Sequence, residues 1–246
     1  MYYFTSDVHL GAGGEHVSRR TEERFVRWLD TVAEDADTIF LVGDIFDFWF
    51  EYGHVVPKGF VRTFGKLAEL TDRGIKIVFL SGNHDMWAKE YLSQECGVEV
   101  FHTPQRLNIA GKSIFLAHGD NMNIGNQPML RLMNTTFRSK AMRWLFSWLI
   151  HPDWAMRFGK WWSGKSRKSH SKDHIDASSL GFLIDYAKEY KANHPDTDYI
   201  IFGHMHYAHD HNSDGLRAIF LGTWEGDSPV SYATIDANGN IGLKTF

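Results

Sequence analysis

The chain has 246 residues and a mass of 28.3 kDa, a length that suits one domain or one domain with a large insertion. Apolar residues make up 43% and charged residues 23%, which is typical of a soluble globular protein and excludes wholesale disorder. The single cysteine excludes an internal disulfide and a cysteine-based zinc site. Residues 1–10 lack a secretory signal and no apolar run is long enough for a membrane span, so we expect a cytoplasmic protein.

The first two-thirds of the chain alternate short apolar runs with amphipathic stretches. The runs are rich in β-branched and aromatic residues and predict buried strands at Tyr2–Thr5, Thr38–Val42, Lys76–Leu80 and Lys112–Ala117. Between them, the spacing of apolar residues predicts helices over 18–33 and 57–71, the second with Pro57 in its first turn. Strands that alternate with helices indicate an α/β sheet covered on both faces.

After Gly119 the pattern becomes almost entirely helical, with helices predicted over 128–150, 153–162 and 173–194. Strands then return at Tyr199–Phe202 and 216–221, and the chain ends in a hairpin around Asn238-Gly239. The simplest interpretation is an α/β catalytic domain formed by residues 1–120 and 197–246. Residues 121–196 then form a helical, basic and aromatic cap inserted into it.

Charge is distributed unevenly along the chain. Residues 131–172 contain ten basic residues and one acid, although the whole chain has a net charge of −4. The same segment holds five of the nine tryptophans, and basic residues with tryptophan suit an anionic lipid interface. Two alternatives are an amphipathic helix that only packs on the domain, and a surface for single-stranded nucleic acid. The acidic remainder and the lack of a nucleic-acid motif disfavour the second, so no nucleic-acid partner is expected.

Side chains that can bind metal ions follow five of the predicted strands. The motifs, in chain order, are Asp7-x-His9, Gly43-Asp44-x-x-Asp47, Gly82-Asn83-His84-Asp85, His118-Gly119-Asp120 and Gly203-His204-x-His206. Side chains at the carboxyl ends of strands in an α/β sheet converge on one crevice, and alternate residues of an extended segment share a side. Each motif alone is weak, but five in order predict a metal site. Carboxylate, imidazole and amide ligands without thiolate suit Mn²⁺, Fe or Zn²⁺.

In these motifs the chain resembles the calcineurin-like metallophosphoesterase superfamily. Within it, residues 7–10, 43–49 and 118–120 are similar to the UDP-2,3-diacylglucosamine hydrolase family of lipid A biosynthesis. The similarity to the Bacteroidetes branch of that family runs along most of the chain. The resemblance implies a four-layer α/β sandwich, in which two mixed β-sheets are flanked by helices and carry an inserted helical cap.

The resemblance also implies two divalent metal ions, for which we expect Mn²⁺. One ion would be bound by Asp7, His9, Asp44 and His206, and the other by Asp44, Asn83, His118 and His204. The two ions would share and deprotonate a water, and the resulting hydroxide would attack phosphorus. His84, oriented by Asp47, would stabilise the transition state or protonate the leaving group.

The substrate that the resemblance implies is an amphiphilic nucleotide-lipid, UDP-2,3-diacylglucosamine, cleaved to UMP and 2,3-diacylglucosamine 1-phosphate. The residues expected to contact it are Asn83, His84, Asn126, Lys165, Arg167, Lys168 and His204. The cap would grip the acyl chains and diphosphate, with the protein peripheral on the cytoplasmic face of the inner membrane.

Two other functions stay open on the sequence. The first is another metallophosphoesterase that acts on nucleotides, phosphodiesters or phosphoproteins. The second is a non-catalytic metal-site scaffold, which the complete set of ligand positions disfavours. The nine histidines outside the motifs are predicted not to bind metal, and His209 and His211 are placed in a polar loop.

Overall fold

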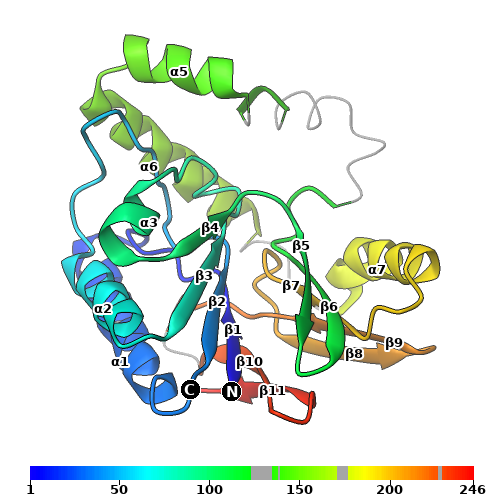
Figure 1. Cartoon of the computed structure of the whole chain (residues 1–246). Helices are drawn as coiled ribbons and strands as arrows, with labels where there is room; N and C mark the ends of the chain where they lie inside the picture. The colour runs from blue at the N-terminus through cyan, green and yellow to red at the C-terminus, as the bar shows by residue number, and fades with distance from the viewer. Residues whose placement is uncertain (123–134, 138, 171–176, 227–228) are drawn as a thin grey trace.

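Two mixed β-sheets form the centre of the computed structural model (Figure 1). The first sheet contains, in spatial order, β11 (Ile241–Thr245), β10 (Ser231–Ile235), β1 (Tyr2–Thr5), β2 (Thr38–Val42), β3 (Lys76–Leu80) and β4 (Glu99–Phe101). The second contains β5 (Gln105–Ile109), β6 (Lys112–Ala117), β7 (Tyr199–Phe202), β9 (Leu216–Phe220) and β8 (His209–Ser213). The structure describes residues 1–122, 135–137, 139–170, 177–226 and 229–246.

The strands that lead to the predicted site run parallel within each sheet. In the first sheet β1, β2, β3 and β4 are parallel. β10 pairs antiparallel with β1, and β11 pairs antiparallel with β10 at the edge of the sheet. In the second sheet β6, β7 and β9 are parallel, while β5 and β8 are antiparallel edge strands. The carboxyl ends of the parallel strands therefore lie at one edge of each sheet.

Helices cover the outer face of each sheet (Figure 1). α1 (Glu15–Val32), α2 (Val61–Asp72) and α3 (Tyr91–Cys96) pack on the first sheet through a core that includes Trp28 and Phe79. α7 (Gly181–Asn193), preceded by the 3₁₀ turn η1 (Ala177–Leu180), packs on the second sheet. The two sheets face each other through a third apolar core, in which the rings of Phe4 and Phe40 stack with their centroids 4.6 Å apart. The predicted α/β class with two mixed, helix-flanked sheets is confirmed.

Two further helices, α5 (Lys140–Leu149) and α6 (Pro152–His170), lie beyond the carboxyl ends of the strands, at the top of Figure 1. No helix within the described residues combines the length and apolarity that a membrane span needs. The boundaries given to the cap, 121–196, stay a prediction.

Several predicted helix boundaries were wrong. The second helix begins at Val61 and not at Pro57, because Gly59 and Phe60 have φ angles of 114° and 58°, which no α-helix accommodates. α6 continues to residue 170, eight residues past its predicted end. Of the predicted helix 173–194, the described part is a 3₁₀ turn followed by α7. The predicted helix 128–150 begins among residues outside the described ones, and its described part includes α5.

The placement of His209 and His211 in a loop was also wrong. Both belong to β8, which pairs antiparallel with β9. The turn between the two strands is Asp214-Gly215, whose φ angles of 54° and 74° are those of a two-residue hairpin turn. The Asp-Gly pair was the sequence signal for this hairpin. The strand itself is polar and at a sheet edge, so it lacks the apolar alternation that reveals most strands.

Candidate metal centre

The loops that follow β1, β2, β3, β6 and β7 bring the predicted site residues together. Asp7 and His9 follow β1, Asp44 and Asp47 follow β2, Asn83 and His84 follow β3, His118 follows β6, and His204 and His206 follow β7. Backbone hydrogen bonds join the first two loops, since the amides of Asp7 and His9 donate to the carbonyls of Gly43 and Asp44, both at 3.0 Å. Both sheets therefore contribute side chains to one site.

The backbone of these loops is unusual. Within the described residues, eight non-glycine residues have a positive φ, and five of them are predicted ligands: Asp7, His9, Asp44, His204 and His206. Left-handed conformations cost a non-glycine residue on the order of 1–3 kcal/mol each, and they persist where the surrounding structure imposes them. The concentration of this strain at the strand ends marks the site independently of the side-chain chemistry.

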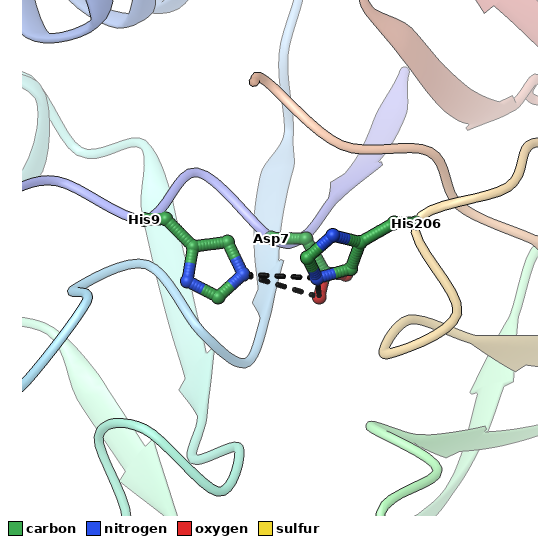
Figure 2. Close-up of side chains that lie close together, drawn as sticks. All are labelled: Asp7, His9 and His206. Atoms are coloured by element: carbon green, nitrogen blue, oxygen red, sulfur yellow. Dashed lines mark hydrogen bonds and ion pairs between the residues drawn. The ribbon is translucent and has the colours of Figure 1, made fainter. Parts of the chain in front are cut away.

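Asp7, His9 and His206 form the first group of side chains (Figure 2). The Nε2 atoms of the two histidines lie 3.0 Å apart. The Oδ1 atom of Asp7 lies 3.8 Å from Nε2 of His9 and 3.3 Å from Nε2 of His206. The other carboxylate oxygen of Asp7 accepts hydrogen bonds from the Ser6 hydroxyl and from the His204 amide, the latter at 2.9 Å. Three ligand-type atoms thus converge while the rest of the Asp7 carboxylate is anchored.

Asp44, His118 and His204 form the second group. The Nε2 atom of His118 lies 3.2 Å from Oδ2 of Asp44. The other ring nitrogen, Nδ1, lies 2.9 Å from the carbonyl of Val42, which can only accept, so Nδ1 carries a proton. In the neutral ring this leaves the lone pair on Nε2, which is the form that binds a metal ion, and the carbonyl fixes the orientation of the ring.

His84 and Asp47 lie between these groups. The backbone amide of His84 donates to Oδ1 of Asp44 at 2.8 Å, and its Nδ1 lies 2.8 Å from the carbonyl of Asp47. The Asp47 carboxylate is 3.6 Å from Nδ1 of His9 but 3.8 Å from Nδ1 of His84. Asp47 therefore contacts His84 through its main chain, while its side chain approaches His9.

Asp85 holds this arrangement in place, a role that the sequence analysis missed. Its fully buried carboxylate accepts hydrogen bonds from the amides of Gly82 at 2.7 Å and Ile45 at 2.8 Å. Two longer contacts, both 3.3 Å, come from the amides of Asp44 and Phe46. Burial, together with the charge of Asp44, raises the pKa of Asp85 to about 7. The signal was present as the last residue of the Gly-Asn-His-Asp motif.

The buried carboxylates and imidazoles shift each other's pKa values. Burial alone would raise the pKa of Asp7, but the imidazoles of His206 and His9 hold it well below its usual range. Burial alone would lower the pKa of His9, yet the carboxylates of Asp47 and Asp7 raise it to about 10. Burial alone would also lower the pKa of His118, but the charge of Asp44 outweighs burial and raises this pKa well above the ordinary value. The Asp7 carboxylate is ionised, and imidazolium charge on His9 and His118 balances negative charge at the site until another cation replaces it.

Among the residues that the structure describes, four buried polar atoms of the cluster have no hydrogen-bond partner. They are Oδ1 of Asp7, Nδ1 of His9, Oδ1 of Asn83 and Nε2 of His118. A buried polar atom without a partner costs about 1–3 kcal/mol. Three of these atoms carry lone pairs that a cation can accept, namely Oδ1 of Asp7, Oδ1 of Asn83 and, in the neutral ring, Nε2 of His118. Oxygen and imidazole donors within 4.8 Å of one another suit divalent ions such as Mn²⁺, Fe or Zn²⁺. The residues present therefore fit divalent metal ions.

An apolar cavity of about 70 Å³ opens beside the cluster. His84 and Asn83 contribute to its lining, and α6 contributes Phe158, Trp162 and Ser163. Of the remaining predicted substrate contacts, Asn126 lies outside the described residues. Lys165, Arg167 and Lys168 lie in the last turns of α6 by their backbone, and their side chains are outside what the structure describes.

Comparison with known proteins identifies the class. Residues 2–208 match the profile of the family described as Calcineurin-like phosphoesterase, so the chain belongs to this family and is a hydrolase that uses divalent metal ions. Among its curated relatives is the UDP-2,3-diacylglucosamine hydrolase of Porphyromonas gingivalis, which is 38% identical over 236 residues, 90% of this chain and 89% of the relative. The enzyme of the same description from Histophilus somni is 26% identical over 242 residues, 96% and 97% of the two chains. The superfamily resemblance found in the sequence is confirmed.

Proposed function

We propose that the chain hydrolyses the diphosphate of UDP-2,3-diacylglucosamine and releases UMP and 2,3-diacylglucosamine 1-phosphate. The observation that carries this proposal is the contact between a buried carboxylate–imidazole cluster and an apolar cavity, since His84 belongs to both. A cluster of this kind suits phosphoryl chemistry, and the apolar lining of the cavity matches the chemistry of an acyl chain. The curated relatives are hydrolases of this nucleotide-lipid, which supports the same substrate here.

We assign the ligands to two ions that share Asp44. One ion would be held by Asp7, His9, Asp44 and His206, and the other by Asp44, Asn83, His118 and His204. When bound, such ions polarise phosphoryl oxygens and lower the pKa of a water at the site. We propose Mn²⁺ as the native metal, with Fe and Zn²⁺ as alternatives that the same donor set accepts.

His84 is proposed to bind the reacting phosphate. Its Nδ1 atom lies 2.8 Å from the Asp47 carbonyl, so in the neutral ring Nδ1 carries the proton and Nε2 has the lone pair. Burial lowers the pKa of His84, and the ring is neutral at pH 7 in the free site. A phosphate placed against Nε2 adds negative charge and favours protonation of that atom. His84 then donates a hydrogen bond to a phosphate or leaving-group oxygen.

The cap is proposed to dock on the cytoplasmic face of the inner membrane. α5 exposes Trp144 and Trp148, which are 65% and 73% accessible and stack with their ring centroids 6.3 Å apart. Trp154 on α6 is 67% accessible. Indole rings partition to the headgroup region, and the basic side chains of the same segment are attracted to anionic lipids.

Product analysis tests the proposed activity. Purified protein with Mn²⁺ is incubated with UDP-2,3-diacylglucosamine, with UDP-N-acetylglucosamine and with bis-p-nitrophenyl phosphate, and the products are identified by mass. We expect UMP and the diacyl sugar phosphate from the first substrate, and little turnover of the second. His118→Ala removes turnover, whereas His16→Ala, an exposed histidine on α1, leaves it intact. Equal turnover of the diacylated and deacylated sugar nucleotides would contradict the proposal and favour a general phosphoesterase.

Vesicle binding tests the membrane proposal. A Trp144→Ala, Trp148→Ala variant is compared with Val61→Ala, which removes an exposed apolar side chain from the body instead of the cap. Flotation with vesicles that contain phosphatidylglycerol is expected to fall severalfold for the tryptophan variant only. Equal flotation of both variants would refute the assignment of this face.

A further inference from the structure

A second and larger cavity, of about 330 Å³, borders the same cluster. It lies between the chain that follows β2 and the first turns of α6, and its lining includes Phe48, Tyr52, Lys58, Met156 and Lys160. Its volume falls in the range of roughly 300–1,000 Å³ that holds small-molecule ligands.

The two cavities share walls and lead to the same centre. Phe48 lines both, and α6 separates them, with Gly159 and Ser163 on the apolar cavity and Met156 and Lys160 on the larger one. The larger cavity reaches the centre at Asp47, whose carboxylate lies 3.6 Å from His9. The smaller reaches it at His84. A diphosphate at the centre would therefore have a separate cavity available for each of its two substituents.

The linings of the two cavities differ in chemistry. The smaller is surrounded mainly by large apolar side chains, namely Phe48, Met86, Trp87, Phe137, Phe158 and Trp162. The larger adds charged and polar groups to its aromatic rings. Lys58 and Lys160 are exposed, and within the described residues neither has a hydrogen-bond or ion-pair partner. The carboxylate of Asp153, which also lines the larger cavity, lies 3.9 Å from Nδ1 of His151.

These groups are complementary to a nucleoside monophosphate. The half-buried aromatic rings of Tyr52 and Phe60 offer faces on which a base can stack. Unpaired ammonium groups attract phosphate oxygens. The Asp153 carboxylate can accept hydrogen bonds from ribose hydroxyls or from a ring N–H. An acyl chain would satisfy none of the charged groups.

We propose that this cavity binds the nucleoside monophosphate half of the substrate, with the base against the aromatic rings and the phosphate near Lys58 and Lys160. The assignment rests on the proposed function, because it divides that substrate between two cavities. It specifies the side of α6 on which the nucleotide lies. UMP, as a product, should then bind the protein without any acyl group.

The experiment measures UMP binding by isothermal titration calorimetry with Mn²⁺ present. Lys160→Ala is compared with Lys188→Ala, an exposed lysine of α7 that lines neither cavity. Loss of one charge-assisted hydrogen bond predicts a Kd for UMP about tenfold higher in Lys160→Ala and no change in Lys188→Ala. The KM for the nucleotide-lipid should rise in the same variant.

A second pair of variants keeps the proposal falsifiable if removal of the charge has little effect. Met156→Trp fills the larger cavity, and Met142→Trp places the same ring on exposed α5, away from both cavities. Only the first should weaken UMP binding, with thermal unfolding used to check that both are folded. If UMP fails to bind the wild type, or binds Lys160→Ala and Met156→Trp as tightly, the proposal is overturned.

These outcomes are distinguishable from failure of the proposed function. Hydrolysis of the nucleotide-lipid with unchanged UMP binding in both variants would reject the cavity and leave the activity standing. Weakened UMP binding in a protein that does not cleave the nucleotide-lipid would support the cavity and reject the substrate.

Discussion

Replacement of Gly43 by alanine should lower both the folding stability of the chain and its affinity for metal ions. Gly43 follows β2, has a φ of 83°, and lies against the imidazole of His118. A Cβ built there would overlap Nδ1 of that ring, which is the atom that contacts the Val42 carbonyl at 2.9 Å. Relief of the overlap must move either the strand end or the ring. In both cases Nε2 of His118 loses its position beside Asp44.

Gly74→Ala supplies a matched control. Gly74 has a φ of 87° and no atom within 4 Å of its built Cβ, so it has the backbone penalty without the overlap. A left-handed alanine costs about 1–2 kcal/mol, and overpacking adds about 1–3 kcal/mol for Gly43→Ala alone. At about 2–4 °C of Tm per kcal/mol in a chain of this size, Gly74→Ala should lower Tm by roughly 2–8 °C and Gly43→Ala by roughly 4–20 °C.

The assay is thermal unfolding with and without saturating Mn²⁺. The ion should raise the Tm of the wild type and of Gly74→Ala by similar amounts, because ligand binding to the folded state stabilises it. In Gly43→Ala this rise should shrink, since His118 is displaced. If the Tm of Gly43→Ala is no lower than that of Gly74→Ala and Mn²⁺ raises it by as much as in the wild type, the overlap with His118 does not control the site and the reasoning is refuted.

Three further predictions concern the same cluster. Asp85→Ala should lower the free energy of urea unfolding by at least about 3 kcal/mol, because it leaves buried amides of the Asp44 loop unpaired; a loss under 1 kcal/mol would contradict this. Asp47→Asn should weaken Mn²⁺ binding about 10- to 100-fold, because the Asp47 carboxylate approaches His9, while the main-chain contact to His84 persists. A fluorescence-monitored titration measures the Mn²⁺ affinity, and an unchanged affinity would show that the Asp47 side chain does not support the site. Mn²⁺ binding should release protons and strengthen as pH rises from 6 to 8, because the pKa of His9 is raised to about 10 and that of His118 is also raised. Calorimetry in buffers of different ionisation enthalpy measures the protons released, and a binding enthalpy that is the same in every buffer would contradict this prediction.

The sheet and the cluster were predictable from the sequence for a common reason. β1, β2, β3 and β6 are short runs of buried β-branched and aromatic residues, and the structure gives them the predicted bounds. Parallel strands are covered on both faces, so their sequences are apolar throughout and their ends are sharp. The polar residue that follows each run is therefore at a known edge of the sheet.

The contacts of the cap could not be predicted in the same way. The pair Trp161-Trp162 dominates the sequence of α6, yet the residue that reaches the catalytic cluster is Ser163, which donates to the Asp47 carbonyl at 2.6 Å. Gly159 permits this approach, because a Cβ there would overlap the ring of Phe48. Helical periodicity identifies the faces of an amphipathic helix, but the partner of each face depends on how the helix is placed in three dimensions.

The position of Ser163 links the two cavities to the chemistry. The Asp47 carbonyl accepts from Ser163 and also fixes Nδ1 of His84, so one main-chain oxygen connects α6 to the proposed phosphate-binding imidazole. α6 lines both cavities, so a ligand in either cavity would contact this helix. A substrate that fills both sides would hold the helix against Asp47 and His84, whereas a substrate lacking either half would leave one side unsupported. Selectivity for the complete nucleotide-lipid would then be expressed in kcat as well as in KM, because remote binding energy positions the reacting groups.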